Sequence, residues 1–277
     1  MIILADIGGT KIRVAYSNGK EFETPLVMPT PSSFDEALEL LDASFKKVAN
    51  QRLVRKVVMG LPGIFDQEFG ELTWSPNLRE WTFKSIRKLV EKIIPGSLAL
   101  FCNDSALVGL GEAVYGAGRG HKIVMYLTVS TGVGGARIVN KEIDKYAVGF
   151  EPGQQIIGVG GRTLEESIGV ASFKRRFGKN PREVSDIRVW DKAAHDLAVG
   201  IYNGILHWSP DVVVVGGPMV LGKPAISLET VRHNLERIAK PLPKLPALIP
   251  AELKDLGGLY GALAFSQISA NKDKIER

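Results

Sequence analysis

The N-terminal segment at residues 6–11, DIGGTK, brings a carboxylate, two glycines, a hydroxyl and a cation together. Glycines let a backbone approach a phosphate closely, with amides that can point at its oxygens. Thr10 adds a hydroxyl donor and Lys11 a positive charge, and Asp6 at the end of a strand could hold a hydrated Mg²⁺. The segment is neither a Walker A loop nor a dinucleotide-binding GxGxxG. Alone, it fits a tight β-turn with a capping aspartate as well as it fits a phosphate site.

Two later glycine segments also follow expected strands. Residues 130–135, STGVGG, offer a hydroxyl at Thr131 and free amides, so a pair of such loops could clamp a triphosphate. Gly216 and Gly217 follow a run of valines and could let an adenine or ribose lie flat against the backbone. As a single motif, each of these segments is weak.

A third kind of chemistry is indicated by Asn103 and Asp104, which follow an apolar strand. In phosphoryl transfer an aspartate accepts the proton of the attacking hydroxyl, while positioning and charge stabilisation do most of the work. The alternative is an Asn-Asp helix cap. Because residues 106–114 have helical character, Asp104 could serve both purposes.

Periodicity and turn signals place these residues on expected elements. Strands are expected at residues 2–5, 11–16, 20–24, 55–59, 97–102, 122–129, 136–139 and 211–215, with a type I′ turn at Asn18-Gly19. Helices are expected at residues 34–48 (after a Ser33 and Glu36 capping box), 79–94, 106–114, 190–208 and 259–269. Glycine turns interrupt the strands at residues 8–9 and 130–135.

The order of these elements predicts an α/β protein built from duplicated βββαβα units that face a cleft. We expect a small N-terminal lobe at residues 1–115, which a C-terminal helix at 259–277 could complete, and a larger lobe at 116–258. Ligands of such sheets bind beyond the strand ends.

Composition narrows the class of protein. The 277 residues are 45% hydrophobic, and 35 basic against 30 acidic side chains leave a net charge of +5, which predicts a globular protein with a solvated surface and no nucleic-acid or membrane partner. The single cysteine, Cys102, excludes a disulfide within the chain and a cysteine-based zinc cluster. The sequence shows no membrane-spanning run and no secretory signal, so a cytoplasmic location is expected.

Taken together, the motifs resemble the ROK family of repressors and sugar kinases, which has the actin-like ATPase (ribonuclease H-like) fold. The resemblance covers nearly the whole chain, and its pieces occur in family order: DIGGTK at 6–11, GLPG at 60–63 with Asp66, PNL at 76–78 with Trp81, ND at 103–104 with Gly111 and Glu112, STGVGG at 130–135, ExG at 151–153, LE at 164–165, VVGGP at 214–218 and GLYGA at 258–262.

The resemblance implies a role for each matching residue. Asp104 resembles the catalytic base, and Asp6 the carboxylate on the Mg²⁺ side. The residues that resemble sugar ligands or pocket lining are Gly63, Asn77, Asn103, Glu151, Gln154 and Glu165. The residues that resemble nucleotide contacts are Gly8, Gly9, Thr10, Lys11, Thr131, Gly132, Gly216 and Gly217. ATP and Mg²⁺ are the implied cofactors, a sugar the implied partner, and a homo-oligomer such as a dimer the implied assembly.

Two departures from the family pattern concern zinc. Many members have a histidine after ExG that binds both sugar and zinc, and here that position is Gln154. The family's CxCGxxGC zinc motif is replaced by residues 158–163, GVGGRT, so we expect no zinc. Gln154 can still donate to and accept from a hydroxyl, but it cannot titrate as histidine does.

The sequence thus predicts an ATP-dependent, glucokinase-like kinase that phosphorylates a hydroxyl of a hexose or hexosamine. One alternative is a non-catalytic sugar sensor related to the family's repressors, which the absence of a DNA-binding segment before the first strand disfavours. The other is an actin-fold kinase for a non-sugar substrate, which Gln154 and the missing zinc motif leave open.

Overall fold

The computed structural model describes residues 1–66, 70–75, 78–239 and 242–275, and in it the chain separates into two units. The first comprises Met1–Gly111 together with Asp255–Arg277, and the second comprises Glu112–Lys254. No helix in the described part of the chain is long and apolar enough to cross a membrane.

The first unit is built on a five-stranded sheet in the order β3-β2-β1-β4-β7. Its strands are β1 (Ile2–Ile7), β2 (Lys11–Ser17), β3 (Leu26–Pro29), β4 (Lys56–Leu61) and β7 (Leu98–Asn103), and a separate two-stranded sheet pairs β5 (Ile64–Asp66) with β6 (Glu71–Trp74). β1 runs antiparallel to β2 and parallel to β4, and β4 runs parallel to β7. The carboxyl ends of β1, β4 and β7 therefore lie at one edge of this sheet.

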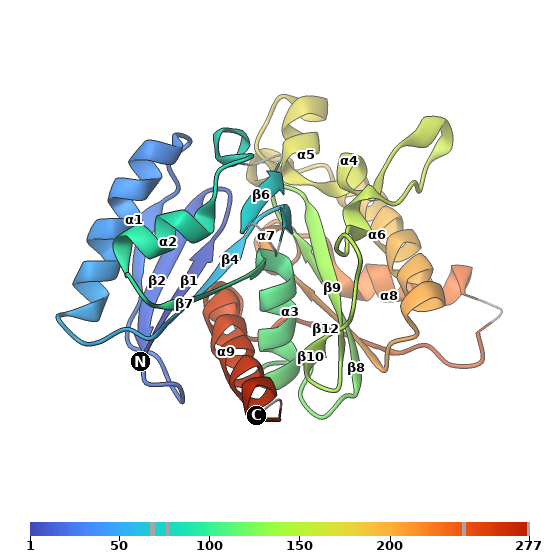
Figure 1. Ribbon diagram of the computed structural model, residues 1–277. Coiled ribbons are helices and arrows are strands. Elements are labelled where there is room, and N and C mark those ends of the chain that lie inside the picture. The colour runs from blue at the N-terminus through green and yellow to red at the C-terminus, as the bar shows by residue number, and fades with distance from the viewer. Residues whose placement is uncertain (67–69, 76–77, 240–241, 276–277) are drawn as a thin grey trace. The chain divides into compact units, whose positions relative to one another are not determined.

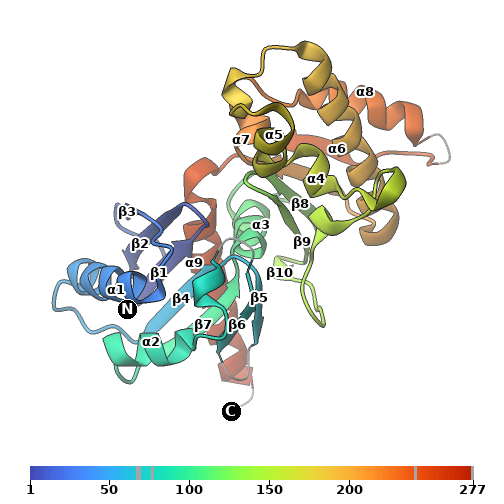
Figure 2. The same cartoon turned by 90° about the horizontal axis from the view of Figure 1, so that it is seen from above.

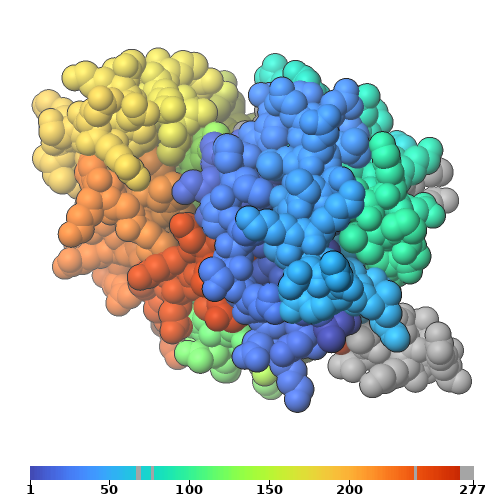
Figure 3. Space-filling model, turned by 90° about the vertical axis from the view of Figure 1, so that its left-hand side faces the viewer, coloured from blue at the N-terminus to red at the C-terminus, as the bar shows by residue number. Residues whose placement is uncertain are grey.

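Helices cover both faces of that sheet (Figures 1 and 2). On one side lie α1 (Phe34–Ala49) and α2 (Ile86–Ile93), whose apolar side chains share one core with the strands. Figure 3 shows the outer face of the unit, over which α1 runs. On the other side lie α9 (Gly257–Ile275), which contacts β1 and β4, and the start of α3 (Asp104–Val114).

Glycines bring α9 unusually close to its neighbours in the first unit. A Cβ atom added to Gly261 would lie 1.7 Å from the Leu107 carbonyl oxygen of α3, and one added to Gly111 would lie 2.5 Å from the Gly257 carbonyl oxygen. No side chain fits at such distances, so the helix backbones pack directly on each other. The second glycine of GLYGA, Gly261, is thereby explained by packing.

The second unit repeats the same sheet. Its strands are β8 (Ile123–Val129), β9 (Val133–Val139), β10 (Glu142–Ile143), β11 (Val212–Gly216) and β12 (Ala247–Pro250), in the order β10-β9-β8-β11-β12. The directions also match, since β8 is antiparallel to β9 and parallel to β11. The duplicated βββαβα pattern predicted from the sequence is confirmed.

Five helices of the second unit share one core with its sheet, and they lie on the same side of it (Figure 2). They are α4 (Leu164–Ile168), α5 (Val170–Phe177), α6 (Ile187–Trp208), α7 (Pro218–Leu221) and α8 (Leu228–Ile238). Short 3₁₀ turns occur at Arg79–Trp81, Pro152–Gln154, Val159–Gly161, Pro181–Glu183 and Lys254–Leu256.

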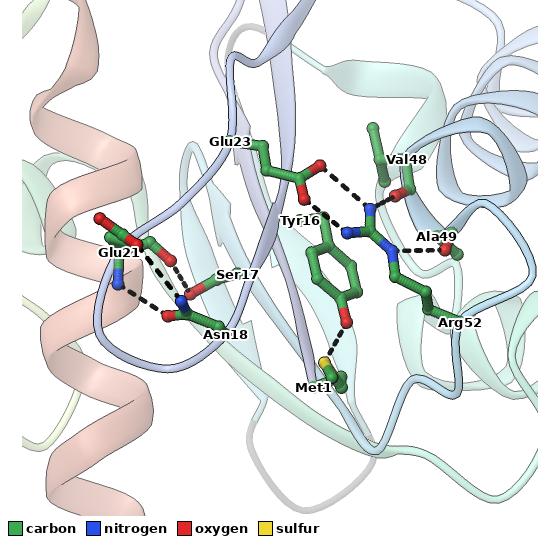
Figure 4. Close-up of polar contacts among 9 residues, drawn as sticks. All are labelled: Met1, Tyr16, Ser17, Asn18, Glu21, Glu23, Val48, Ala49 and Arg52. Carbon is green, nitrogen blue, oxygen red and sulfur yellow. Dashed lines mark hydrogen bonds and ion pairs between the residues drawn. The ribbon is translucent and has the colours of Figure 1, made fainter.

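The strand predicted at residues 20–24 is wrong, because the third strand is β3. Within this segment only Phe22 forms a bridge, to Ser17. The side chain of Asn18 accepts hydrogen bonds from the amide of Lys20 and from that of Glu21, the second of which is drawn in Figure 4. Of the two turn residues only Gly19 has a positive φ (+94°), so the turn is not type I′. The asparagine side chain, by capping its own turn, delays the strand.

Other elements also differ from the sequence-based expectations. The helix expected at residues 79–94 begins only at Ile86, after Phe83 takes a positive φ of 61°. The strands β5 and β6 were not expected. β9 begins at Val133 and includes Gly134 and Gly135, so the second glycine turn is limited to residues 130–132.

Arg52 joins the end of α1 to the connection between β2 and β3 (Figure 4). Its guanidinium donates to the carbonyl oxygens of Val48 (2.7 Å) and Ala49 (3.0 Å) and pairs with the Glu23 carboxylate. It also lies 3.4 Å from the ring centroid of Tyr16. A cation at this end of a helix satisfies carbonyls that lack partners within the helix.

Candidate active site

The turn between β1 and β2 presents backbone donors at its tip. The Gly8 amide donates to the Lys11 carbonyl (2.9 Å), and the Gly8 carbonyl accepts from the Thr30 hydroxyl (2.7 Å). The Thr30 amide donates to the Thr10 carbonyl (3.1 Å). The amides of Gly9 and Thr10 make no hydrogen bond within the described ranges, and both residues are exposed. The turn is therefore held by its carbonyls, and its outer amides can serve an anion.

Asp6 lies just before this turn and is only 8% exposed. Arg13, its direct partner across the β1–β2 pair, approaches one carboxylate oxygen to 3.3 Å and also lies 3.3 Å from Asp255. Burial raises the pKa of Asp6, and the Arg13 charge opposes that rise. On α9, a Cβ atom at Gly258 would lie 2.4 Å from the Asp6 carboxyl carbon, so α9 covers the carboxylate.

Asn103 and Asp104 lie where β7 passes into α3. The Asn103 side chain accepts from the Ala106 amide (3.1 Å) and donates to the Gly63 carbonyl (3.1 Å). Asp104 is half-buried and accepts from the Ser105 amide (2.7 Å). Asn103 thus takes the capping role, and Asp104 occupies the first turn of α3, where the helix dipole favours an ionised carboxylate.

Gly63 is a glycine for a backbone reason. Its φ is +116°, and a Cβ atom there would lie 2.1 Å from the Trp74 carbonyl oxygen of β6. Asn77, the other sugar ligand expected in this part of the chain, lies outside the described residues.

Cys102 is buried, which raises the pKa of its thiol to about 12 and leaves it protonated at neutral pH.

The turn between β8 and β9 matches the first turn in position. The Ser130 amide donates to the Gly132 carbonyl (2.8 Å), and the carbonyls of Ser130 and Thr131 accept from the amides of Val170 (2.9 Å) and Ala171 (3.2 Å). The amides of Thr131 and Gly132 donate to no described residue. As in the first turn, the carbonyls accept hydrogen bonds, and two amides remain available to an anion.

Glu165, Gln154 and Glu151 come together beside this second turn. One Glu165 oxygen, Oε2, accepts from the Val133 amide (2.9 Å), and the other, Oε1, lies 3.4 Å from Gln154 Nε2. Burial, and secondarily the Glu165 charge, raise the pKa of Glu151. This part of the structure therefore gathers two carboxylates and an amide, which suits a ligand with several hydroxyls.

The segment that carries Gln154 is held by hydrogen bonds. Gln155 donates to the Pro152 carbonyl (2.8 Å) and accepts from Asn203 of α6 (2.9 Å), and the Arg162 carbonyl accepts from the amides of Ile157 and Gly158. Within the described ranges, no group of three or more His, Cys, Asp or Glu side chains is placed to hold a metal.

Gly216 ends β11 and Gly217 follows it, at the same sheet edge as the second turn, because β11 and β8 are parallel. Gly217 has a φ of +90°, and a Cβ atom there would lie 2.3 Å from the Val129 carbonyl oxygen. The close approach of β8 alone requires a glycine at 217, whether or not a nucleotide binds there.

The expected site residues thus form two groups, one in each unit. The first unit holds Asp6, Gly8, Gly9, Thr10, Lys11, Gly63, Asn103 and Asp104, and the second holds Thr131, Gly132, Glu151, Gln154, Glu165, Gly216 and Gly217. The sequence analysis missed Arg13, Thr30 and Asn203. Of these three, only Arg13 could have been found from the sequence, because the register of the first hairpin pairs it with Asp6.

Comparisons with known proteins agree on the family. The model of the ROK family matches residues 2–153. An N-acetyl-D-glucosamine kinase of Escherichia coli is 27% identical over 297 residues, covering 93% of this chain and 96% of that protein.

Solved structures give the same result. A ROK hexokinase from Thermus thermophilus superimposes with a TM-score of 0.83 at 25% identity, covering 97% of this chain and 99% of that one. A ROK family glucokinase from Streptomyces griseus, in complex with glucose and AMPPNP, gives a TM-score of 0.76 at 20% identity, covering 95% and 98%. The predicted actin-like ATPase fold is confirmed. Because the family model spans more than half of the sequence, this chain is a member of the ROK family.

Proposed function

We propose that this protein transfers the γ-phosphoryl group of ATP to a hydroxyl of a hexose or hexosamine, with Asp104 as the general base. One observation carries the proposal. The turn after β1, Gly63 after β4 and Asp104 after β7 all follow the carboxyl ends of parallel strands, so they share one edge of one sheet. In open α/β sheets that edge is where ligands bind.

Asp104 supplies the proton acceptor of the reaction. As the sugar hydroxyl oxygen bonds to the γ-phosphorus, its proton passes to the Asp104 carboxylate, and the bond from phosphorus to the bridging oxygen breaks to release ADP. Asp104 lies in the first turn of α3, next to the end of β7, and its backbone position is set by that helix.

Each glycine turn, taken in its own unit, is a candidate for contacts with nucleotide phosphates. Each turn offers two amides with no partner among the described residues, and each adds an exposed threonine, Thr10 or Thr131. Lys11 contributes a charge, and Gly216 with Gly217 would border the base.

Asp6 fits a water-mediated contact to Mg²⁺. Its carboxylate is a hard oxygen donor, and Arg13 lies near one oxygen, so the remaining ligands would be water and phosphate, as Mg²⁺ prefers. When bound, Mg²⁺ would neutralise charge on the phosphates. Zinc does not fit residues 158–163 or Gln154, because neither offers a thiolate or an imidazole.

In the second unit, sugar hydroxyls would be bound by Glu151, Gln154 and Glu165. In the first unit, Asn103 is the candidate for such a contact. Asn103 keeps one donor and one acceptor position after its contacts with Gly63 and Ala106. A site of carboxylates and amides discriminates strongly against substrates that lack a hydroxyl. The similarity to hexose and hexosamine kinases supports this substrate class.

The test is the Asp104→Asn variant in a coupled assay of ADP release over a panel of hexoses and hexosamines. We expect kcat to fall by about 10²–10⁴-fold with little change in sugar and nucleotide binding. Asp35→Asn, the same change in the first turn of α1, is the matched control and should keep wild-type turnover.

Near-normal turnover of Asp104→Asn would refute the assignment of the base. If the wild-type protein binds ATP but phosphorylates no sugar, the substrate is of another class. If it binds a sugar and consumes no ATP, the chain is a sugar sensor.

A further inference from the structure

Glu165 contacts the second glycine turn as well as the expected sugar end of the site. We propose that Glu165 is a positioning residue for this turn, so that one carboxylate couples sugar binding to nucleotide binding. The coupling rests on the proposed function, whereas the contact with the turn does not depend on which sugar is bound.

Two distances define the contact. Oε2 of Glu165 accepts from the Val133 amide at 2.9 Å, directly after the turn, and a Cβ atom on Gly132 would lie 2.1 Å from the same oxygen. Glu165 therefore occupies the space that a side chain at 132 would need. Its other oxygen, Oε1, lies 3.4 Å from Gln154 Nε2, on the segment expected to bind the sugar.

The backbone of Glu165 is itself well held. Thr163 and Glu166 form a reciprocal capping box at the start of α4, with bonds of 3.1 and 3.0 Å. At its other end α4 leads into α5, whose first amides, those of Val170 and Ala171, bond the turn carbonyls. The turn is thus fixed in two ways. Amides of α5 donate to its carbonyls, and Glu165 accepts from the Val133 amide.

This arrangement separates the roles of the turn amides. The Val133 amide is satisfied by a carboxylate, and those of Thr131 and Gly132 have no partner among the described residues and can serve a phosphate. A sugar hydroxyl that donates to Glu165 would immobilise the carboxylate that orders the turn, so the nucleotide would bind more tightly. By linkage the nucleotide would strengthen sugar binding by the same factor.

The experiment is calorimetric titration of the full chain with AMPPNP and Mg²⁺ in the absence of sugar. We expect Glu165→Ala to weaken AMPPNP binding about tenfold, as loss of a charge-assisted hydrogen bond would. Glu165→Gln should keep most of the affinity, because its amide oxygen can still accept from Val133. Glu236→Ala, which removes an exposed carboxylate of α8 and no bond to the turn, should bind AMPPNP as the wild type does.

A double-mutant cycle separates this mechanism from simple crowding. Gly132→Ala should also weaken AMPPNP binding, because the methyl group displaces Glu165, and it should add little in the Glu165→Ala background. If the two effects add fully, or if Glu165→Ala binds AMPPNP like the wild type, the proposal is overturned. Should Glu165→Ala fail to fold, the variants Glu165→Gln and Gly132→Ala decide. Weaker AMPPNP binding by Gly132→Ala alone supports the proposal, and unchanged AMPPNP binding by both variants refutes it. Failure of the proposed function would appear separately, as absence of sugar phosphorylation by the wild-type protein.

Discussion

The two glycine turns occupy the same place in two sheets of the same topology, yet they are held by different groups. The turn after β1 is fixed by neutral contacts from Thr30, and α9 packs against the adjacent Asp6 through Gly258. The turn after β8 is fixed by α5 amides and by the Glu165 carboxylate.

This difference has a physical consequence. Close backbone packing has no alternative arrangement nearby, because interiors are dense and a displaced helix would leave voids. A carboxylate on a side chain can change partners, and its strength as an acceptor depends on competing donors. The first turn should therefore be insensitive to the substrate, while the second should respond to it.

The largest effect should come from Gly258→Ala, which breaks the support of the first turn. A methyl group there would lie 2.4 Å from the Asp6 carboxyl carbon, so α9 or Asp6 must move. We expect a loss of about 1–3 kcal/mol of stability, or roughly 3–9 °C in Tm by thermal unfolding. Gly8→Ala is the control, because its methyl group would approach only the Lys11 carbonyl oxygen, at 3.3 Å. Equal Tm values for the two variants would contradict close packing at Gly258.

A smaller effect is expected from Thr30→Val, which tests whether the first turn depends on one neutral hydrogen bond. The valine keeps the shape of threonine and its backbone bond to Thr10 but removes the 2.7 Å bond to the Gly8 carbonyl. We expect a loss of about 1 kcal/mol and a change in AMPPNP affinity smaller than that caused by Glu165→Ala. A larger change than Glu165→Ala would reverse the contrast between the turns.

The smallest effect concerns pH and Glu151, beside the second turn. Burial and Glu165 raise its pKa above the usual 4.5, so the folded state holds this proton to a higher pH than the unfolded state does. Stability contributed by the protonated form is therefore lost as pH rises from 4.5 through the raised pKa. Glu151→Gln should match the wild type near pH 4 and show a slightly higher Tm at pH 7, measured by calorimetry.

Glu236→Gln, on the exposed side of α8, controls for removal of a charge alone. The same rise in Tm in that variant would show that net charge, rather than the environment of Glu151, is responsible.

Local signals in the sequence succeeded where structure depends on neighbours along the chain. The core strands, the helix after Ser33 and the first glycine turn follow from periodicity, capping and glycine. The expectation failed at residues 20–24, where a side-chain turn by Asn18 competed with strand pairing, and at Ile86, where the helix starts late. The first failure arises from a short-range polar contact that periodicity does not report, and the second from the positive φ of Phe83, which interrupts the expected helix.

For the candidate site, residue types and motif order were sufficient to single out the two turns, Asp104 and the pair Glu151 and Glu165. They could not reveal that Thr30 holds Gly8, because this contact joins residues whose separation in the chain carries no pattern. The Asn-Asp helix cap was an alternative that the sequence offered, and the structure gives the capping role to Asn103. Arg13 is the exception, since the register of the hairpin predicts that it pairs with Asp6.

By itself, the sequence determined the family, the duplicated topology and the chemical kinds of group available, because these depend on local propensity and on the order of motifs. The tertiary structure alone decided how those groups are held. Glu165 reaches the Val133 amide, Asn203 reaches Gln155, and Gly258 makes room for Asp6, since packing brings distant segments within bonding distance. The contrast between a rigid first turn and a carboxylate-held second turn follows from those contacts.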